Sequence, residues 1–279
     1  MTVFKQSLFY WLFWVVLACF FNLGVYYIYG LEKALEFAAG YLLEQSLSID
    51  NLFVFLLIFS YFKVHPDNQH RILYWGIFGA LVLRAAFIFG GVFLIQYFSW
   101  LFYVFGIILL LTSIKLVFHK EDNDLSKNWV LRICKKILPI TSNYVGSSFI
   151  TKEHGKFVFA PALLVLVMVE FSDIIFAMDS LPAIFAITLD PLIIYSSNLF
   201  AILGLRSLYF VLGQAMSMFE YLKYGIVIIL GFVGIKILIK DFYHVPILLT
   251  LSFIISIMII AILFSVIKNK LKGKTCEQP

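Results

Sequence analysis

Charged residues are scarce in this chain of 279 residues: Asp, Glu, Lys and Arg make up 13% of it, and hydrophobic residues make up 62%. Soluble globular domains carry about 25% charged residues. The scarcity excludes an ordinary soluble domain and predicts an all-α, polytopic membrane protein with a single transmembrane domain over residues 1–279. The formal net charge of +5 does not indicate nucleic-acid binding, because most basic residues fall in predicted loops and in the C-terminal tail.

Cysteine is also rare. Cys19, Cys134 and Cys276 form no CxxC pair and no metal-binding spacing, so neither a disulfide framework nor a thiolate site is indicated. The sequence has no nucleophile–base pair and no cofactor-binding loop. We therefore expect neither enzymatic activity nor a permanently bound cofactor.

Long apolar runs predict the transmembrane helices. A helix needs about 20 apolar residues to cross a bilayer. The first run is too long for a signal-peptide core and lacks a cleavage site, so we expect it to remain as a helix. Eight spans are predicted: 7–29, 33–62, 72–95, 99–118, 157–188, 195–215, 220–240 and 246–267.

Two of these spans, 33–62 and 157–188, are too long for a straight crossing. Each holds about 30 residues, or roughly 45 Å of helix. They must tilt strongly or break, and Pro182 favours a break in the second span.

Basic residues predict the orientation. With eight spans, 15 of the 21 Lys and Arg residues fall on one side, Lys33 and Lys240 fall on the other, and four lie inside spans. The positive-inside rule then places both termini in the cytoplasm, and we expect a multi-pass protein of the cell inner (plasma) membrane. Residues 119–156 form a cytoplasmic loop whose stretch SKNWVLRICKKILP fits either an interfacial helix or a solvated connector.

The sequence contains an internal repeat, with one copy over about 31–118 and the other over about 157–240. The segment EQSLSIDNLFVF from Glu44 aligns without gaps with DIIFAMDSLPAI from Asp173, and FGALVLRAAFIFG aligns with FAILGLRSLYFVL. Arg84 thereby falls on Arg206, and a third aligned pair places Lys115 on Lys236. Because each copy has three spans, the copies cross the membrane in opposite senses. Such inverted repeats build substrate sites near the midplane from broken helices.

Five acidic residues lie within spans, where a charge costs roughly 2.5–3.5 kcal/mol and therefore indicates function. Set against Arg84 and Arg206, they leave three negative charges, which a divalent cation and a proton would neutralise. The five are Glu44, Asp50, Glu170, Asp173 and Asp179. A break at residues 46–48 would be needed to aim Glu44 and Asp50 at one point, because about 600° of regular helix separates them. The same holds for Asp173 and Asp179.

The polar groups near these acids are oxygen donors, namely the Asn51 amide and the Ser46, Ser48, Ser172 and Ser180 hydroxyls. Oxygen ligands favour Mn²⁺, Ca²⁺ or Mg²⁺ over Zn²⁺ or Cu⁺. Met178 would add a soft ligand, although membrane methionines more often fill gaps. A structural alternative stays open, in which the acids pair with the four arginines and lysines of the repeat and join the helices.

The two motif regions, ALEFAAGYLLEQSLSIDNLFVFLLIFSYFKV and VEFSDIIFAMDSLPAIFAITLDP, resemble the signature regions of the TerC family, named for tellurium resistance. SNLFAILGLRSLYF is also similar, and the resemblance covers about residues 30–240. It implies kinship with a wider group of transporters that includes the lysine exporters, and a role in manganese export or metal homeostasis. Many members begin with a further helix containing an Asp, whereas this chain starts at the next helix.

The resemblance implies a metal-ligand set from both motifs, with further residues in support. The set is Glu44, Asp50, Asn51, Glu170, Asp173, Asp179 and Ser180, supported by Ser48, Arg84 and Arg206.

We therefore expect a transporter that exports Mn²⁺, or Ca²⁺, with protons as counter-ion, because buried carboxylates must release protons to bind metal. Its partners would be the metal ion, protons and the lipid bilayer, with no nucleic acid; the sequence carries no signal for an oligomeric state. One alternative function is resistance to tellurite or oxyanion stress. The five buried carboxylates would, however, repel an anion. Another alternative is a membrane factor that assists insertion or metal loading of exported proteins, which predicts a large exposed partner surface.

Overall fold

The computed structural model describes residues 3–98, 100–118, 150–153, 156–215, 222–243 and 245–275. Some side chains within these ranges, including those of Asp50 and Asp179, are not described. The predicted interfacial helix SKNWVLRICKKILP also lies outside the described residues.

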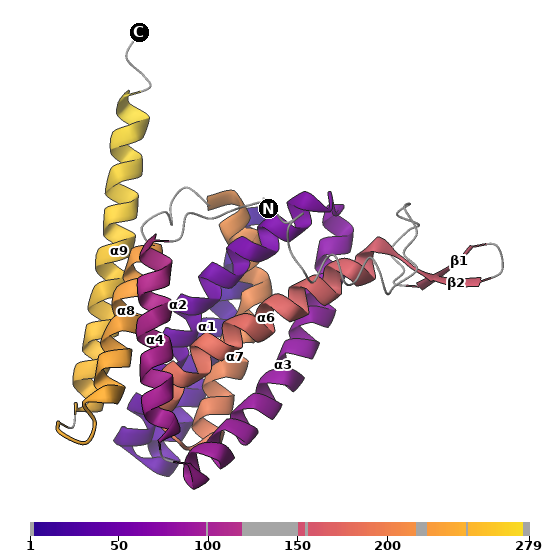
Figure 1. Ribbon diagram of the computed structural model, residues 1–279. Helices are drawn as coiled ribbons and strands as arrows, with labels where there is room; N and C mark the ends of the chain where they lie inside the picture. Colours follow the sequence, from indigo (N-terminus) through magenta and orange to yellow (C-terminus); the bar gives the residue numbers. More distant parts are fainter. Residues whose placement is uncertain are drawn as a thin grey trace.

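The described chain is a bundle of eight α-helices with one short β-hairpin (Figure 1). The all-α, polytopic architecture is thus confirmed, and α1 begins at the same end of the bundle at which α9 ends (Figure 1). The helices are α1 (Val3–Tyr29), α2 (Leu31–Tyr61), α3 (Pro66–Tyr97), α4 (Leu101–Phe118), α6 (Pro161–Phe185), α7 (Pro191–Ala215), α8 (Leu222–Leu238) and α9 (Ile247–Thr275), and the strands are β1 (Ile150–Glu153) and β2 (Lys156–Phe159).

Six of the described helices, all except α4 and α8, are long and apolar enough to cross a membrane. Their number and composition make the chain a multi-pass membrane protein. Helices α4 and α8 are apolar but shorter, with 18 and 17 residues, or about 25–27 Å of helix against a hydrocarbon core of about 30 Å.

The largest difference from the predicted spans is at 157–188. Residues up to Phe159 belong to β2, which pairs antiparallel with β1, and α6 starts only at Pro161. Proline lacks an N–H group and favours the first position of a helix, which explains why α6 starts there.

Both motif helices are continuous, so the predicted breaks are wrong. Helix α2 runs without interruption through residues 46–48, where the Ser46 hydroxyl donates to the Leu42 carbonyl at 2.7 Å. Pro182 lies in the last turn of α6, which ends three residues later at Phe185. Its missing N–H leaves the Met178 carbonyl without its i→i−4 partner, but the helix continues through this point. Tilt accommodates the length: Figure 1 shows α6 lying obliquely to α4 and α8.

The helix packing fits the internal two-fold relation that the sequence repeat predicts. Helix α2 packs against α7 and α3 packs against α6, and these two contacts exchange when the repeats are exchanged. The contacts α4–α8, α2–α6 and α3–α7 each join equivalent helices of the two repeats. Helix α1 packs on α2 and α7, and α9 packs on α2 and α8, so both lie outside the repeated core.

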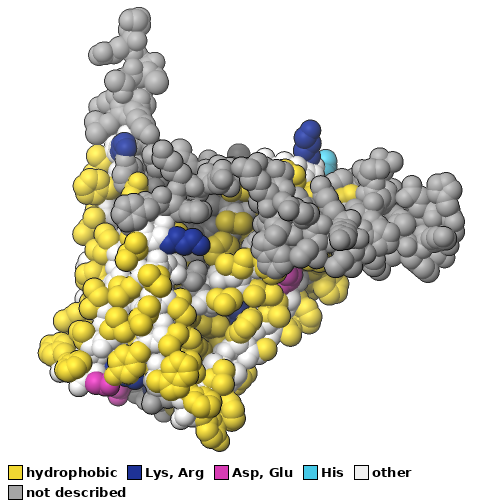
Figure 2. Space-filling model, viewed as in Figure 1, with side chains coloured by type: hydrophobic (Ala, Val, Ile, Leu, Met, Phe, Trp, Pro, Cys, Tyr) yellow, Lys and Arg dark blue, Asp and Glu magenta, His cyan; other side chains and the backbone are white. Residues whose placement is uncertain are grey.

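A single residue, Gly30, joins α1 to α2 and lets α2 turn back along α1. Its φ of +90° and ψ of 178° lie in a region that only glycine adopts readily. Helices α2 and α7 are the most enclosed, whereas large apolar side chains of α1, α3 and α9 face outward. Hydrophobic side chains cover most of the described face in Figure 2, as a lipid-facing surface requires.

Candidate functional site

Arg84 lies at the centre of the bundle and joins three helices from the two repeats. It extends from α3 and is only 1% exposed. Its Nε and Nη2 donate to the two carboxylate oxygens of Asp173 on α6, at 3.1 and 2.9 Å, and its Nη1 donates to Glu44 Oε1 on α2. This bidentate geometry is the strong form of a guanidinium–carboxylate pair. Two motif acids that are equivalent in the repeat therefore share one buried cation.

The continuous helices align equivalent polar residues on matching faces. Glu44, Ser48 and Asn51 are four and three residues apart on α2, so they share one face, and all are buried. On α6, Asp173 and Ser180 occupy the corresponding positions and are also buried. The structure thus brings these five predicted residues into the core between the repeats.

Asp50 and Asp179 follow Glu44 and Asp173 by six residues along unbroken helices. About 600° of helical rotation separates the members of each pair. Their side chains lie outside the described part of the structure. Their assignment as metal ligands therefore stays a prediction.

Glu170 adds a third carboxylate, one turn before Asp173 on α6. Its Oε1 lies against Gly79 of α3, where the Cβ of any larger residue would collide with it. Its Oε2 is buried and has no hydrogen-bond partner among the described residues. Three carboxylates around the one guanidinium of Arg84 leave two formal negative charges.

Another buried oxygen near this group, the Ser48 hydroxyl, has no partner among the described residues. The Ser180 hydroxyl lies close enough to the Glu44 carboxylate to interact with it. A buried polar group without a partner is costly, so such atoms mark a place where a ligand or water would bind. Among the described side chains, no three His, Cys, Asp or Glu residues converge into a preformed metal cluster. In this conformation the space between Glu44 and Asp173 holds Arg84 instead.

Arg206 does not join the acids, which corrects the expectation that both arginines neutralise them. Its only polar partner in the described part of the chain is His70, whose Nδ1 lies 3.4 Å from Arg206 Nη2. It lines a cavity of about 10 Å³ together with Glu170 and Asp173, but it forms no ion pair with either. The physical reason is that Glu44 and Asp173 are symmetry equivalents, and one guanidinium fills the space between them.

The other basic residues of the repeat also stay away from the motif acids. Lys115 is exposed near the end of α4, and Lys236 donates to Thr250 Oγ1 at 3.1 Å. Of the four basic residues that could pair with the motif acids and join the helices, only Arg84 does so in the described structure. Met178 is 62% exposed, so it is neither a ligand of this buried group nor a gap-filler.

The sequence analysis missed a second charged group, at the end of the bundle where α2 and α7 begin. Lys33 Nζ lies 2.8 Å from Glu36 Oε2 and 3.4 Å from Asp190 Oδ2, which ties α2 to the loop before α7. These residues line a cavity of about 990 Å³ with Lys236 and Lys240. The signal was the i, i+3 spacing of Lys33 and Glu36 at the start of the predicted span 33–62.

Comparison with known proteins places the chain in a family. The model of the integral membrane protein TerC family matches residues 29–273. The membrane protein STKORF319 of Myxococcus xanthus is 46% identical over 96% of this chain and 84% of its own length. A Salmonella typhi protein called Alx, named for a proposed role as a membrane-bound redox modulator, is 44% identical over 97% of this chain and 87% of its own.

A membrane protein of Rickettsia felis is 42% identical over 96% of this chain and 89% of its own length. No solved structure shows a significant match to the chain. The family match covers both acidic motifs and the helices that carry them. The chain therefore belongs to the TerC family of integral membrane proteins.

Proposed function

We propose that this protein transports divalent metal cations, with Mn²⁺ as the preferred ion, out of the cytoplasm in exchange for protons. One observation carries the proposal: acids of both repeated motifs meet at Arg84 in the centre of the bundle, and Glu170 beside them keeps a buried carboxylate oxygen without a partner among the described residues. Ionisable residues buried in a transmembrane bundle mark ion pathways.

The charge of the group supports a cation as cargo. Glu44, Asp173 and Glu170 exceed Arg84 by two formal negative charges, which one divalent cation would neutralise. An oxyanion such as tellurite would meet repulsion from the same carboxylates. The available donors are carboxylate and hydroxyl oxygens, which suit Mn²⁺, Mg²⁺ and Ca²⁺.

Arg84 would compete with the transported cation for the same carboxylates. Its guanidinium occupies the space between Glu44 and Asp173 and pairs with both carboxylates. A cation that binds these carboxylates must displace Arg84 from at least one of them. Because Arg84 belongs to one repeat and Asp173 to the other, displacement from Asp173 would loosen the contact between repeats, as a rocking mechanism requires.

Protons are the proposed counter-ions. After the metal leaves, carboxylates such as Glu170, which has no cationic partner here, would be neutralised by protons in an apolar surrounding. Acid on the side that offers metal should compete with binding. A proton gradient directed against the metal flux should drive export.

The test is Mn²⁺ flux in proteoliposomes at a fixed metal gradient, with the pH gradient imposed, removed and reversed. We expect flux to rise when protons move against the metal and to fall when the gradient is reversed. Asp50→Asn and Asp179→Asn should abolish flux and cellular Mn²⁺ tolerance while the protein still accumulates in the membrane. Equal flux under all three conditions would contradict exchange, and full tolerance in both variants would make the motif acids structural.

A further inference from the structure

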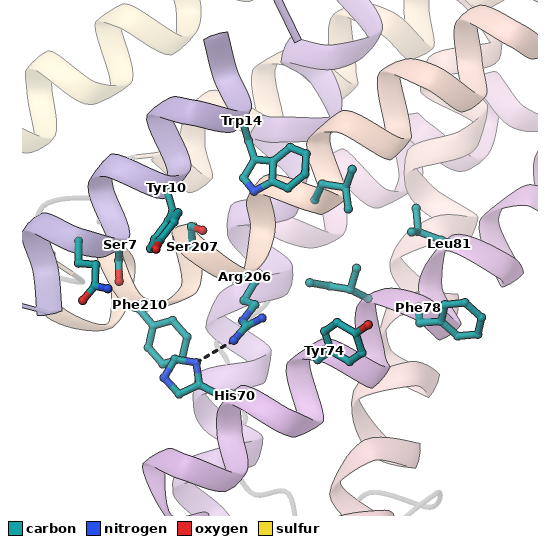
Figure 3. A pocket seen from close by; sticks show the side chains of 13 residues that line it. Ser7, Tyr10, Trp14, His70, Tyr74, Phe78, Leu81, Arg206, Ser207 and Phe210 are labelled. Carbon is teal, nitrogen blue, oxygen red and sulfur yellow. Dashed lines mark hydrogen bonds between the residues drawn. The ribbon is translucent and has the colours of Figure 1, made fainter. Parts of the chain in front are cut away.

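A pocket of about 770 Å³ lies between α1 and α3, which both pack on α7 (Figure 3). This volume is within the range of about 300–1,000 Å³ typical of small-molecule sites. Tyr10, Tyr74 and Phe78 on its rim are 50%, 61% and 59% exposed. In a membrane-spanning bundle these side chains face lipid, so the pocket opens sideways toward the bilayer.

The pocket is polar at one end and apolar at the other. Its polar end lies where α1 and α3 begin, with Gln6, Ser7 and His70, and Figure 3 shows Arg206 of α7 pointing toward His70. Its apolar end, two to three turns farther along α1 and α3, is lined by Trp14, Ile77, Leu81 and Leu203. A ligand that fits this polarity has a polar head and an apolar tail.

Arg206 gives the pocket its charge. Arg84, its equivalent in the repeat, is neutralised by two carboxylates, whereas Arg206 contacts no carboxylate in the described part of the structure. A guanidinium within a transmembrane helix is costly unless an anion accompanies it. Because no described carboxylate contacts Arg206, an anion from the surroundings would offset this cost. Guanidinium groups bind phosphate through two parallel hydrogen bonds.

We propose that this pocket binds an anionic phospholipid, with its phosphate at Arg206 and one acyl chain between α1 and α3 beside Trp14 and Leu81. Tyrosine and tryptophan gather at the head-group level of membranes, which matches the position of Tyr10 and Tyr74. Basic pockets between transmembrane helices on the cytoplasmic side suit anionic head groups, and the predicted orientation places this end of the bundle there.

The experiment compares retained lipids by native mass spectrometry after the full chain has been reconstituted in phosphatidylcholine vesicles containing phosphatidylglycerol. Wild type should retain phosphatidylglycerol in preference to phosphatidylcholine. Arg206→Gln should lower that preference about tenfold, the equivalent of one charge-assisted contact. Lys5→Gln removes an exposed positive charge at the same end of α1 without touching the pocket, and it should keep the preference.

A second variant keeps Arg206 and fills the tail end. Leu81→Trp should reduce retention of both lipids while leaving the exposed surface unchanged, so the proposal stays testable if Arg206→Gln fails to fold. Equal retention of both lipids by wild type would overturn the proposal. So would an unchanged preference in Arg206→Gln, normal retention in Leu81→Trp, or displacement of the lipid by inorganic phosphate alone, which would indicate a site for free anions.

Discussion

The two repeats place one arginine each at the same point of their second helix, Arg84 on α3 and Arg206 on α7, and the surroundings of the two differ. Arg84 is buried between Glu44 and Asp173 and holds both. Arg206 faces a large lateral pocket and contacts the ring of His70. The contacts between helices follow the two-fold relation, but the partners of the two arginines do not.

The difference follows from where the acids lie. Glu44 and Asp173 exchange under the two-fold relation, so they lie on both sides of its axis, and a single guanidinium can fill the space between them. Arg206 therefore has no place between these acids and instead lines the pocket between α1 and α3. A neighbouring position also differs between the repeats: Gly79, against which the carboxylate of Glu170 lies, aligns with Ala201.

Removing each arginine in turn should give the largest contrast. Arg84→Gln leaves two buried carboxylates without their cation, and breaking a buried ion pair in this way costs about 3–5 kcal/mol. We expect poor accumulation in the membrane and a lower unfolding temperature in detergent. Arg206→Gln should cost less than about 1 kcal/mol, because it breaks no ion pair in the described structure. Equal losses for the two variants would remove the asymmetry on which this account depends.

Gly79→Ala should have an intermediate effect. The added methyl group would displace the Glu170 carboxylate. Because this group is the end of a flexible side chain, we expect a cost at the lower end of the range of about 1–3 kcal/mol typical of overpacking. Gly76→Ala, one turn earlier on α3, is the matched control, because its Cβ would meet Val169 Cγ1 at an ordinary 3.4 Å. Adding Glu170→Ala to Gly79→Ala should restore the unfolding temperature. No coupling in this double-mutant cycle would show that the two residues do not touch.

The smallest effect is expected for the charged group at the end of the bundle where α2 and α7 begin. Lys33, with its side chain 32% exposed, joins Glu36 to Asp190 and so links the two repeats near the surface. Exposed pairs contribute only about 0.2–1 kcal/mol and weaken in salt. Lys33→Gln should therefore shift the unfolding temperature slightly at low salt and not at 1 M NaCl. A loss as large as that of Arg84→Gln would mean that this contact, rather than the central one, holds the repeats together.

The elements of the fold were predictable because hydropathy and basic-residue bias are local signals. All eight predicted spans correspond to helices, and the repeat located the acids that meet at Arg84. The breaks were predicted wrongly because span length alone does not distinguish a tilted helix from a broken one. Pro182 added weight to the error, although a proline in the last turn disturbs little.

The arrangement of the site was less predictable. A repeat shows that Arg84 and Arg206 are equivalent but not that only one of them fits between the acids. The contact of Glu170 with Gly79 depends on how α6 crosses α3, which no local pattern specifies. The charged group around Lys33 was missed because Glu36 lies at the edge of the apolar run, although α2 includes it.

The most direct measurement is binding of Mn²⁺ to the purified full chain, followed by electron paramagnetic resonance together with proton release. Glu170→Gln removes one charge without breaking an ion pair, and Glu36→Gln is its control, a buried acid paired with Lys33 at the far end. The account predicts one bound Mn²⁺ per wild-type chain with release of protons. It also predicts binding about tenfold weaker or more in Glu170→Gln and unchanged in Glu36→Gln. Equal binding by all three proteins, or none by wild type, would contradict a metal site at the buried carboxylates.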